Sequence, residues 1–148
     1  MRQPPPYKLT APVPLERDVH EAVAKLLYKL LEGVDGVEWC NYPAGIVKLT
    51  PAQQAAYARA GLRRGYPDFV IYADAVYGIE LKRRGGRLSK TTIGRTARGS
   101  PQLLIGQEEM FPRLLRCGCW RDIAICHDTL EVLAALTRWQ IPHRRAAA

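Results

Sequence analysis

Two carboxylates and a lysine stand at the ends of two short apolar runs in RGYPDFVIYADAVYGIELKRRGG, residues 64–86. Asp68 opens the run DFVIYA, and Glu80 and Lys82 close the run VYGIELK. Both runs are short and rich in β-branched and aromatic residues, which predicts two strands of a hairpin joined around residues 73–75. In such a hairpin, Asp68 lies beside Glu80 and Lys82.

This arrangement predicts a metal site. Side chains two apart on a strand share a face, so Glu80 and Lys82 point the same way while Leu81 turns to the opposite, buried face. Two close carboxylates repel each other unless one is protonated or a cation bridges them. Mg²⁺ fits best, with Mn²⁺ expected to substitute, and the expected ligands are Asp68, Glu80 and the backbone carbonyl of Leu81. Lys82 is then placed to orient a water molecule or to stabilise charge on phosphorus.

The E-x-K triplet by itself also fits a surface salt-bridge cluster on a solvated strand face, which contributes little to stability. Three features of the surrounding sequence favour chemistry. Gly65 and Pro67 form a tight turn that delivers Asp68, the hairpin spacing matches, and a basic stretch follows directly.

The charge balance indicates the class of partner. The 148 residues carry 22 Lys and Arg against 14 Asp and Glu, a formal net charge of +8. Such an excess attracts polyanions, so nucleic acid is the leading partner, and a basic solvated surface without a ligand is the alternative. Residues 83–106 contain no acidic residue and are interpreted as a basic, mobile loop. Its candidate DNA-binding residues are Arg83, Arg84, Arg87, Lys90, Arg95 and Arg98.

The rest of the chain predicts one domain over residues 15–140, preceded by an irregular arm (1–14) and followed by a frayed tail (141–148). Thr50, Pro51, Gln53 and Gly61 are start and stop signals of the second helix, and Pro112 is expected to kink or split the third. The expected helices cover 15–31, 50–61, 100–118 and 128–139, and the expected strands cover part of 36–45, 68–73, 76–82 and 121–126. This order predicts an α/β fold with a mixed sheet flanked by helices.

The cysteines and one histidine suggest a second kind of metal site. Cys117, Cys119, Cys126 and His127 could form a zinc cluster, but C-x-C is not the usual zinc spacing, and Cys126 ends an apolar run where Cys packs as a small hydrophobe.

No long apolar stretch indicates a signal peptide or a membrane span, so a cytoplasmic protein with no membrane partner is expected.

The segment RGYPDFVIY…YGIELKRRGGRLSK resembles the VRR-Nuc domain (virus-type replication-repair nuclease), a branch of the PD-(D/E)xK nuclease superfamily. The resemblance covers roughly residues 15–137 and rests on the G-x-P-D turn, the E-L-K strand and the GGRLSK continuation. It implies a restriction-endonuclease-like fold, in which a mixed β-sheet core is flanked by α-helices, and a Mg²⁺-dependent endodeoxyribonuclease.

The resemblance adds two site residues. The family carries a Glu on the first helix near the metal, matched here by Glu16, which on structural grounds could instead be a favourable charge in a first helical turn. The family also carries a Gln at the start of the helix after E-x-K, matched by Gln107, with Gln102 as the competitor. His20, one turn after Glu16, is on the same helical side. Residues 91–106, TTIGRTARGSPQLLIG, are an insertion relative to the family pattern.

The implied function is cleavage of DNA, with branched or junction DNA as a plausible substrate and a homodimer making two cuts. The implied setting is phage or bacterial replication, repair or recombination, in the bacterial host cytoplasm if a phage encodes the chain. The alternative is a non-catalytic DNA-binding accessory module with the same fold.

Overall fold

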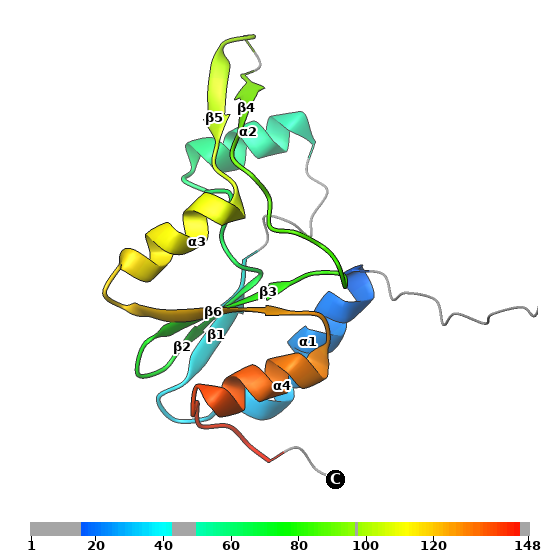
Figure 1. Cartoon of the computed structure of the whole chain (residues 1–148), viewed down its shortest axis with the longest axis vertical. Coiled ribbons are helices and arrows are strands. Elements are labelled where there is room, and N and C mark those ends of the chain that lie inside the picture. Colours follow the sequence, from blue (N-terminus) through cyan, green and yellow to red (C-terminus); the bar gives the residue numbers. More distant parts are fainter. Residues whose placement is uncertain (1–15, 43–49, 97, 146–148) are drawn as a thin grey trace, which may run out of the picture.

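The chain folds as a mixed α/β unit, with a four-stranded mixed sheet, a separate two-stranded sheet and four helices among the described residues (Figure 1). The computed structural model describes residues 16–42, 50–96 and 98–145. The helices are α1 (Glu16–Leu31), α2 (Pro51–Arg59), α3 (Gln107–Arg116) and α4 (Thr129–Arg138). The strands are β1 (Glu38–Asn41), β2 (Phe69–Tyr72), β3 (Val76–Leu81), β4 (Thr92–Arg95), β5 (Pro101–Leu104) and β6 (Trp120–Cys126).

The larger sheet has the strand order β1-β2-β3-β6. β1, β2 and β3 are antiparallel neighbours, and the predicted β2–β3 hairpin is confirmed, with Phe69 opposite Ile79 and Tyr72 opposite Val76. β6 lies parallel to β3. Parallel strands need a long crossover connection, which here contains β4, β5 and α3. β3, with Glu80 near its end, is therefore a central strand.

Alternate residues of β3 face the two sides of this sheet. Tyr77, Ile79 and Leu81 belong to the main hydrophobic core, to which α1 and α4 contribute. Glu80 faces the other side, where it contacts α3, and Figure 1 shows α3 across the sheet from α1 and α4. The α1 residues in the core follow the expected helical spacing: they are Val23, Leu27, Leu30 and Leu31. Burial of each such side chain contributes roughly 1.5–3 kcal/mol.

Residues 83–106 do not form the predicted mobile loop throughout. β4 and β5 pair there as an antiparallel hairpin, with Thr92 opposite Leu104 and Arg95 opposite Pro101. Its first strand begins in the run TTI, where β-branched side chains favour an extended backbone.

The predicted helix start at Ser100 and Pro101 is wrong. Pro101 opens β5, where a proline without a backbone N–H is tolerated at the first residue of a strand. α3 begins at Gln107, after the N-cap Gly106. α3 then runs as one helix through Pro112, so the helix is not split there.

The other helix ends agree with the sequence signals. α2 has the predicted capping box, in which the Thr50 hydroxyl and the Gln53 side chain each accept a hydrogen bond from the other residue's backbone N–H. Asp128 caps α4 by accepting from the backbone N–H of Glu131.

The predicted arm over residues 1–14 lies outside the described residues. The predicted frayed tail is wrong for residues 141–144: Ile141 is buried in the core, and the backbone N–H of Arg144 donates to the carbonyl of Leu30 over 2.9 Å. Among the described helices, none combines the length and the apolar character that a membrane crossing requires.

Candidate active site

The β2–β3 register brings Asp68 and Glu80 together. The last assigned pair is Phe69 opposite Ile79, so the next residues along the two strands, Asp68 and Glu80, face each other on one side of the hairpin. Asp68 is held at the end of β3 because its Oδ2 accepts a hydrogen bond of 2.7 Å from the backbone N–H of Leu81. The hairpin pattern predicts this juxtaposition.

The turn that delivers Asp68 depends on two glycines. Gly65 has a φ of 85°, in the left-handed region that favours glycine, and a Cβ there would lie 2.9 Å from Cβ of Met110. The buried Pro67 packs on Gly78, where a Cβ would lie 2.8 Å from the proline Cγ. The missing side chains let this turn pack directly against β3 and α3, which fixes the position of Asp68.

Glu80 is a buried carboxylate with one satisfied and one unsatisfied oxygen. Its side chain is 2% exposed, and its Oε1 lies 2.6 Å from Nζ of Lys82. The same Oε1 accepts a 2.6 Å hydrogen bond from Nε2 of Gln107. Oε2 is buried and has no hydrogen-bond partner among the described residues. An unsatisfied buried charged oxygen costs at least about 1–3 kcal/mol, so Oε2 is a position where a bound cation or donor is stabilising.

Both carboxyls are harder to ionise than usual. Burial raises the pKa of Asp68, and the hydrogen bond from the Leu81 N–H and the positive charge of Lys82 offset only part of this rise. Burial, followed by the negative charge of Asp68, raises the pKa of Glu80 despite its ion pair and its amide hydrogen bond. A positive charge placed between the two carboxyls would favour their ionised forms.

Glu16, the first residue of α1, lies at the edge of this pair. It is exposed, and its negative charge contributes to the raised pKa of Asp68. The structure gives no direct contact between the two side chains, so metal binding by Glu16 stays a prediction.

His20 lies beneath the site, one turn after Glu16. It is 8% exposed, and its ring stacks on Phe69 with the centroids 4.4 Å apart. Burial lowers the pKa of His20, against the negative charges of Glu16 and Glu80. Its Nε2 is the second buried polar side-chain atom without a hydrogen-bond partner in the described part of the chain. The helical spacing from Glu16 is the sequence signal for this residue.

Gln107, and not Gln102, reaches the site. While its Nε2 donates to Glu80, its Oε1 accepts from the backbone N–H of Ser89 over 3.3 Å, and its own backbone N–H donates to Oγ of Ser89 over 3.0 Å. Gln102 lies in β5, opposite Gly94. Ser89 is not among the predicted site residues, because its contact with Gln107 joins positions 18 residues apart in the chain.

The six predicted DNA-binding residues are all exposed, but their surroundings differ. Arg84 lies 3.2 Å from a carboxylate oxygen of Asp128 and 3.7 Å from one of Glu131, so its charge is already balanced by the first turn of α4. Arg95 donates to the carbonyl of Gly99 in the hairpin turn over 3.1 Å, and no carboxylate in the described part of the chain forms an ion pair with it. We therefore expect Arg84 to contribute least to phosphate binding.

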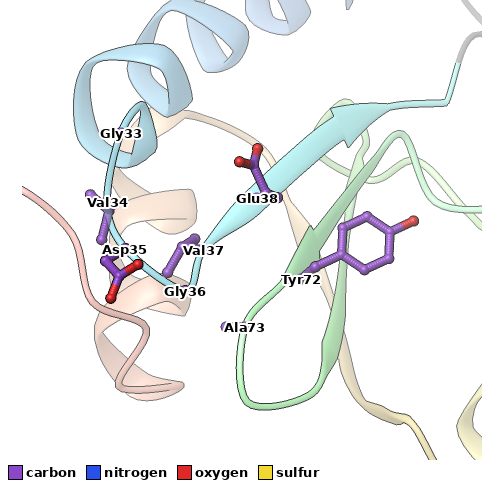
Figure 2. A pocket seen from close by; sticks show the side chains of 8 residues that line it. All are labelled: Gly33, Val34, Asp35, Gly36, Val37, Glu38, Tyr72 and Ala73. Carbon is purple, nitrogen blue, oxygen red and sulfur yellow. The ribbon is translucent and has the colours of Figure 1, made fainter.

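Figure 2 shows a hollow at the far end of the same sheet. Its volume is about 430 Å³, and it is lined by residues 33–38, Tyr72 and Ala73. Because Tyr72 ends β2 at the end away from Asp68, this hollow is not part of the candidate site.

Within the described ranges, no three His, Cys, Asp or Glu side chains are grouped as a metal site. This includes the cysteine cluster considered from the sequence: Cys117 and Cys119 are exposed free thiols, and burial raises the pKa of Cys126 to about 11, which disfavours the thiolate that binds zinc. Comparisons of the chain with protein-family models, with curated proteins and with solved structures found no match in any of the three.

Proposed function

We propose that this chain is a Mg²⁺-dependent DNA endonuclease with a restriction-endonuclease-like fold of the VRR-Nuc type, acting on branched or junction DNA. One observation carries the proposal: Asp68, Glu80 and Lys82 meet at the end of a central strand, and a buried oxygen of Glu80 has no hydrogen-bond partner among the residues that the structure describes. A solvated surface salt bridge would not leave a carboxylate buried and half-satisfied.

The donor set fits magnesium. Mg²⁺ keeps several waters and is commonly held by one or two carboxylates together with substrate phosphate oxygens, so a pair of carboxylates is sufficient. Asp68 and Glu80 would hold the ion, with the backbone carbonyl of Leu81 and the side chain of Glu16 as further ligands. When bound, the ion supplies positive charge that polarises the phosphodiester and favours ionisation of water.

Lys82 has donors left for the reaction. Its ammonium group carries three donors, and the ion pair with Oε1 of Glu80 fixes its position. The remaining donors can hold the attacking water or a phosphate oxygen, which stabilises the negative charge that develops during hydrolysis. Gln107 keeps the Glu80 carboxylate in one orientation, because its amide bonds both Glu80 and the backbone at Ser89.

DNA binding is the electrostatic part of the proposal. Five basic residues follow the site in the chain without an intervening acidic residue: Arg83, Arg87, Lys90, Arg95 and Arg98. Contacts from such side chains to phosphates would position the protein on DNA without reading the base sequence. A homodimer would place two such sites on opposite strands of a junction.

The test is cleavage of supercoiled plasmid and of synthetic linear, flap and four-way DNA, with Mg²⁺ or Mn²⁺ and with EDTA. We expect metal-dependent cutting that Lys82→Ala lowers by at least about 100-fold, in the range of a lost charge-stabilising group. Lys29→Ala is the matched control: Lys29 is exposed on α1 and lies 13 residues from Glu16, roughly 20 Å along the helix.

Absence of cutting with either metal would refute the nuclease proposal. Metal-independent DNA binding in that case would support the accessory-module alternative. If Lys82→Ala and Lys29→Ala reduce cutting equally, this site is not responsible for it. The cause would then be a contaminating nuclease or a nonspecific effect of removing one positive charge.

A further inference from the structure

The β4–β5 hairpin exposes two large aliphatic side chains side by side. Ile93 and Leu103 are direct cross-strand partners, and they are 77% and 61% exposed. Figure 1 shows the hairpin projecting from the body of the molecule, away from the four-stranded sheet. A hairpin that only bound phosphates would do so better with polar side chains here, so the apolar pair indicates an apolar partner surface.

The same face of the hairpin carries positive charge. Side chains two apart on a strand share a face, so Arg95 lies on the face of Ile93 and Leu103. The opposite face is closed by Leu104, whose Cδ1 would lie 2.7 Å from a Cβ at Gly94. With Arg98 exposed in the turn, the exposed face combines an apolar centre with a cationic rim.

The base of the hairpin is tied to the candidate site. Thr91 Oγ1 donates to Oε2 of Glu109 over 2.7 Å and accepts from the backbone N–H of Gly106 over 3.1 Å. Ser89, just before it in the chain, bonds Gln107, which bonds Glu80. Ile93 stands two residues beyond Thr91, about 7 Å along a strand, so the exposed pair is connected to the candidate site through the base of the hairpin.

We propose that Ile93 and Leu103 form an apolar wedge that packs against an unstacked base at a branch in DNA, with Arg95 and Arg98 on the flanking phosphates. The positive charge of the hairpin favours a polyanionic partner. In DNA, the large apolar surfaces are the faces of the bases, and stacking covers these faces in a continuous duplex. Inserted aliphatic side chains are a known way for proteins to hold an opened base step. The wedge thus accounts for a preference for branched over continuous DNA.

This inference rests on the DNA-binding part of the proposed function and not on cutting, so the test is run in EDTA. The probe is a four-way junction with 2-aminopurine at the branch, and a linear duplex with the same label is its comparison. We expect the full-length protein to raise the fluorescence of the junction, because the labelled base loses its stacking neighbours. The double variant Ile93→Thr/Leu103→Thr keeps β-branched or small side chains on an exposed strand, and we expect it to abolish this rise and to weaken junction binding about tenfold.

Two controls isolate the wedge. Leu130→Thr replaces an aliphatic residue of α4 that is 74% exposed, and we expect it to leave the junction signal unchanged. Arg95→Gln/Arg98→Gln is expected to weaken binding to both DNAs and to lower the salt dependence of binding by about two phosphate contacts.

An unchanged fluorescence rise in the Ile93/Leu103 variant would overturn the inference, as would the absence of any rise with the unmodified protein. If the variant has a lower solution mass than the unmodified protein and binds the junction equally well, the inference is also overturned. The exposed face would then contact a second copy of the chain. Unstacking without metal-dependent cutting would uphold the wedge while refuting the nuclease, so the two failures are distinguishable.

Discussion

Replacement of Asp68 by Asn should make the metal-free protein more stable and at the same time abolish the metal-dependent cutting that we propose. The side chain keeps its size, and an amide oxygen can still accept the 2.7 Å hydrogen bond from the backbone N–H of Leu81. What disappears is a negative charge in a half-buried position facing the carboxylate of Glu80. Residues that form an active site commonly destabilise the fold in this way.

The size of the gain follows from opposing charges. Opposite residues of a hairpin are about 5 Å apart, and at an effective dielectric constant of about 20 two unit charges at that distance repel by about 3 kcal/mol. Attraction to the ammonium group of Lys82 has a similar size and the opposite sign. The remaining term is the desolvation that dominates the raised pKa of Asp68. We therefore expect a net gain of about 1 kcal/mol, which corresponds to about 2–4 °C in Tm for a domain of this size.

The gain should depend on pH with a defined sign. The pKa of Asp68 is higher in the folded protein than its ordinary value, near 3.9 in an unfolded chain. Between these two values the folded protein binds a proton that the unfolded chain releases, so stability falls as pH rises through this window. Asp68→Asn removes this loss. The gain in unfolding free energy of Asp68→Asn over the unmodified protein should therefore be largest above the pKa of Asp68 in the folded protein. The gain should vanish as pH falls below about 4.

Thermal unfolding in EDTA between pH 4 and pH 8 measures this effect, and added Mg²⁺ should raise the Tm of the unmodified protein but not of Asp68→Asn. Asp35→Asn is the matched control, since Asp35 is exposed in the turn after α1 shown in Figure 2. If Asp68→Asn is less stable than the unmodified protein at pH 7.5, or if its stability relative to the unmodified protein does not change with pH, the view of Asp68 as a half-buried, destabilising charge is wrong.

Three further predictions concern the neighbours of this pair. Gln107→Leu should slow cutting by about tenfold or more and lower stability by roughly 1.5–3 kcal/mol, the usual range for a hydrogen bond to a charged group, whereas Gln102→Leu should change neither cutting rate nor Tm. Gly106→Ala should lower the free energy of unfolding, measured with urea, by about 1–3 kcal/mol, because its Cβ would lie 2.3 Å from backbone atoms across the base of the hairpin. Gly118→Ala is the control and should not lower it, because the space around Gly118 is open. His20→Phe should keep the aromatic stack, lose the unpartnered nitrogen and unfold in urea at an equal or higher midpoint, whereas His20→Ala should cost about 2 kcal/mol or more as a cavity forms.

Local patterns were sufficient for much of the fold and for the centre of the site. The β2–β3 hairpin follows from two apolar runs, and the period of two places Glu80 and Lys82 on one face. The capping signals of α2 and α4 correspond to hydrogen bonds in the structure. Each of these features is set by residues a few positions apart, where spacing and side-chain chemistry determine the outcome.

Features set by contacts between distant segments were not predictable in this way. The sequence of residues 100–106 predicts the start of a helix, but the segment contains a strand because Pro101 and Leu104 pair with Arg95 and Thr92. The burial of Ile141 depends on packing with the rest of the core rather than on its own segment. The partnership of Gln107 with Ser89 required knowledge of where β4 and β5 begin and end.

The segment that carries the β4–β5 hairpin leaves the candidate site intact because its two ends meet. Glu108 N–H donates to the carbonyl of Ser89 over 3.1 Å, and Gly106 sits so close to the backbone of residues 89 and 90 that it has no room for a Cβ. A segment whose ends are already in contact can be lengthened at little cost to the structure that it leaves and rejoins. Ser89 and Gln107 are therefore neighbours in space although the hairpin separates them in the chain, and Gln107 keeps its hydrogen bond to Glu80.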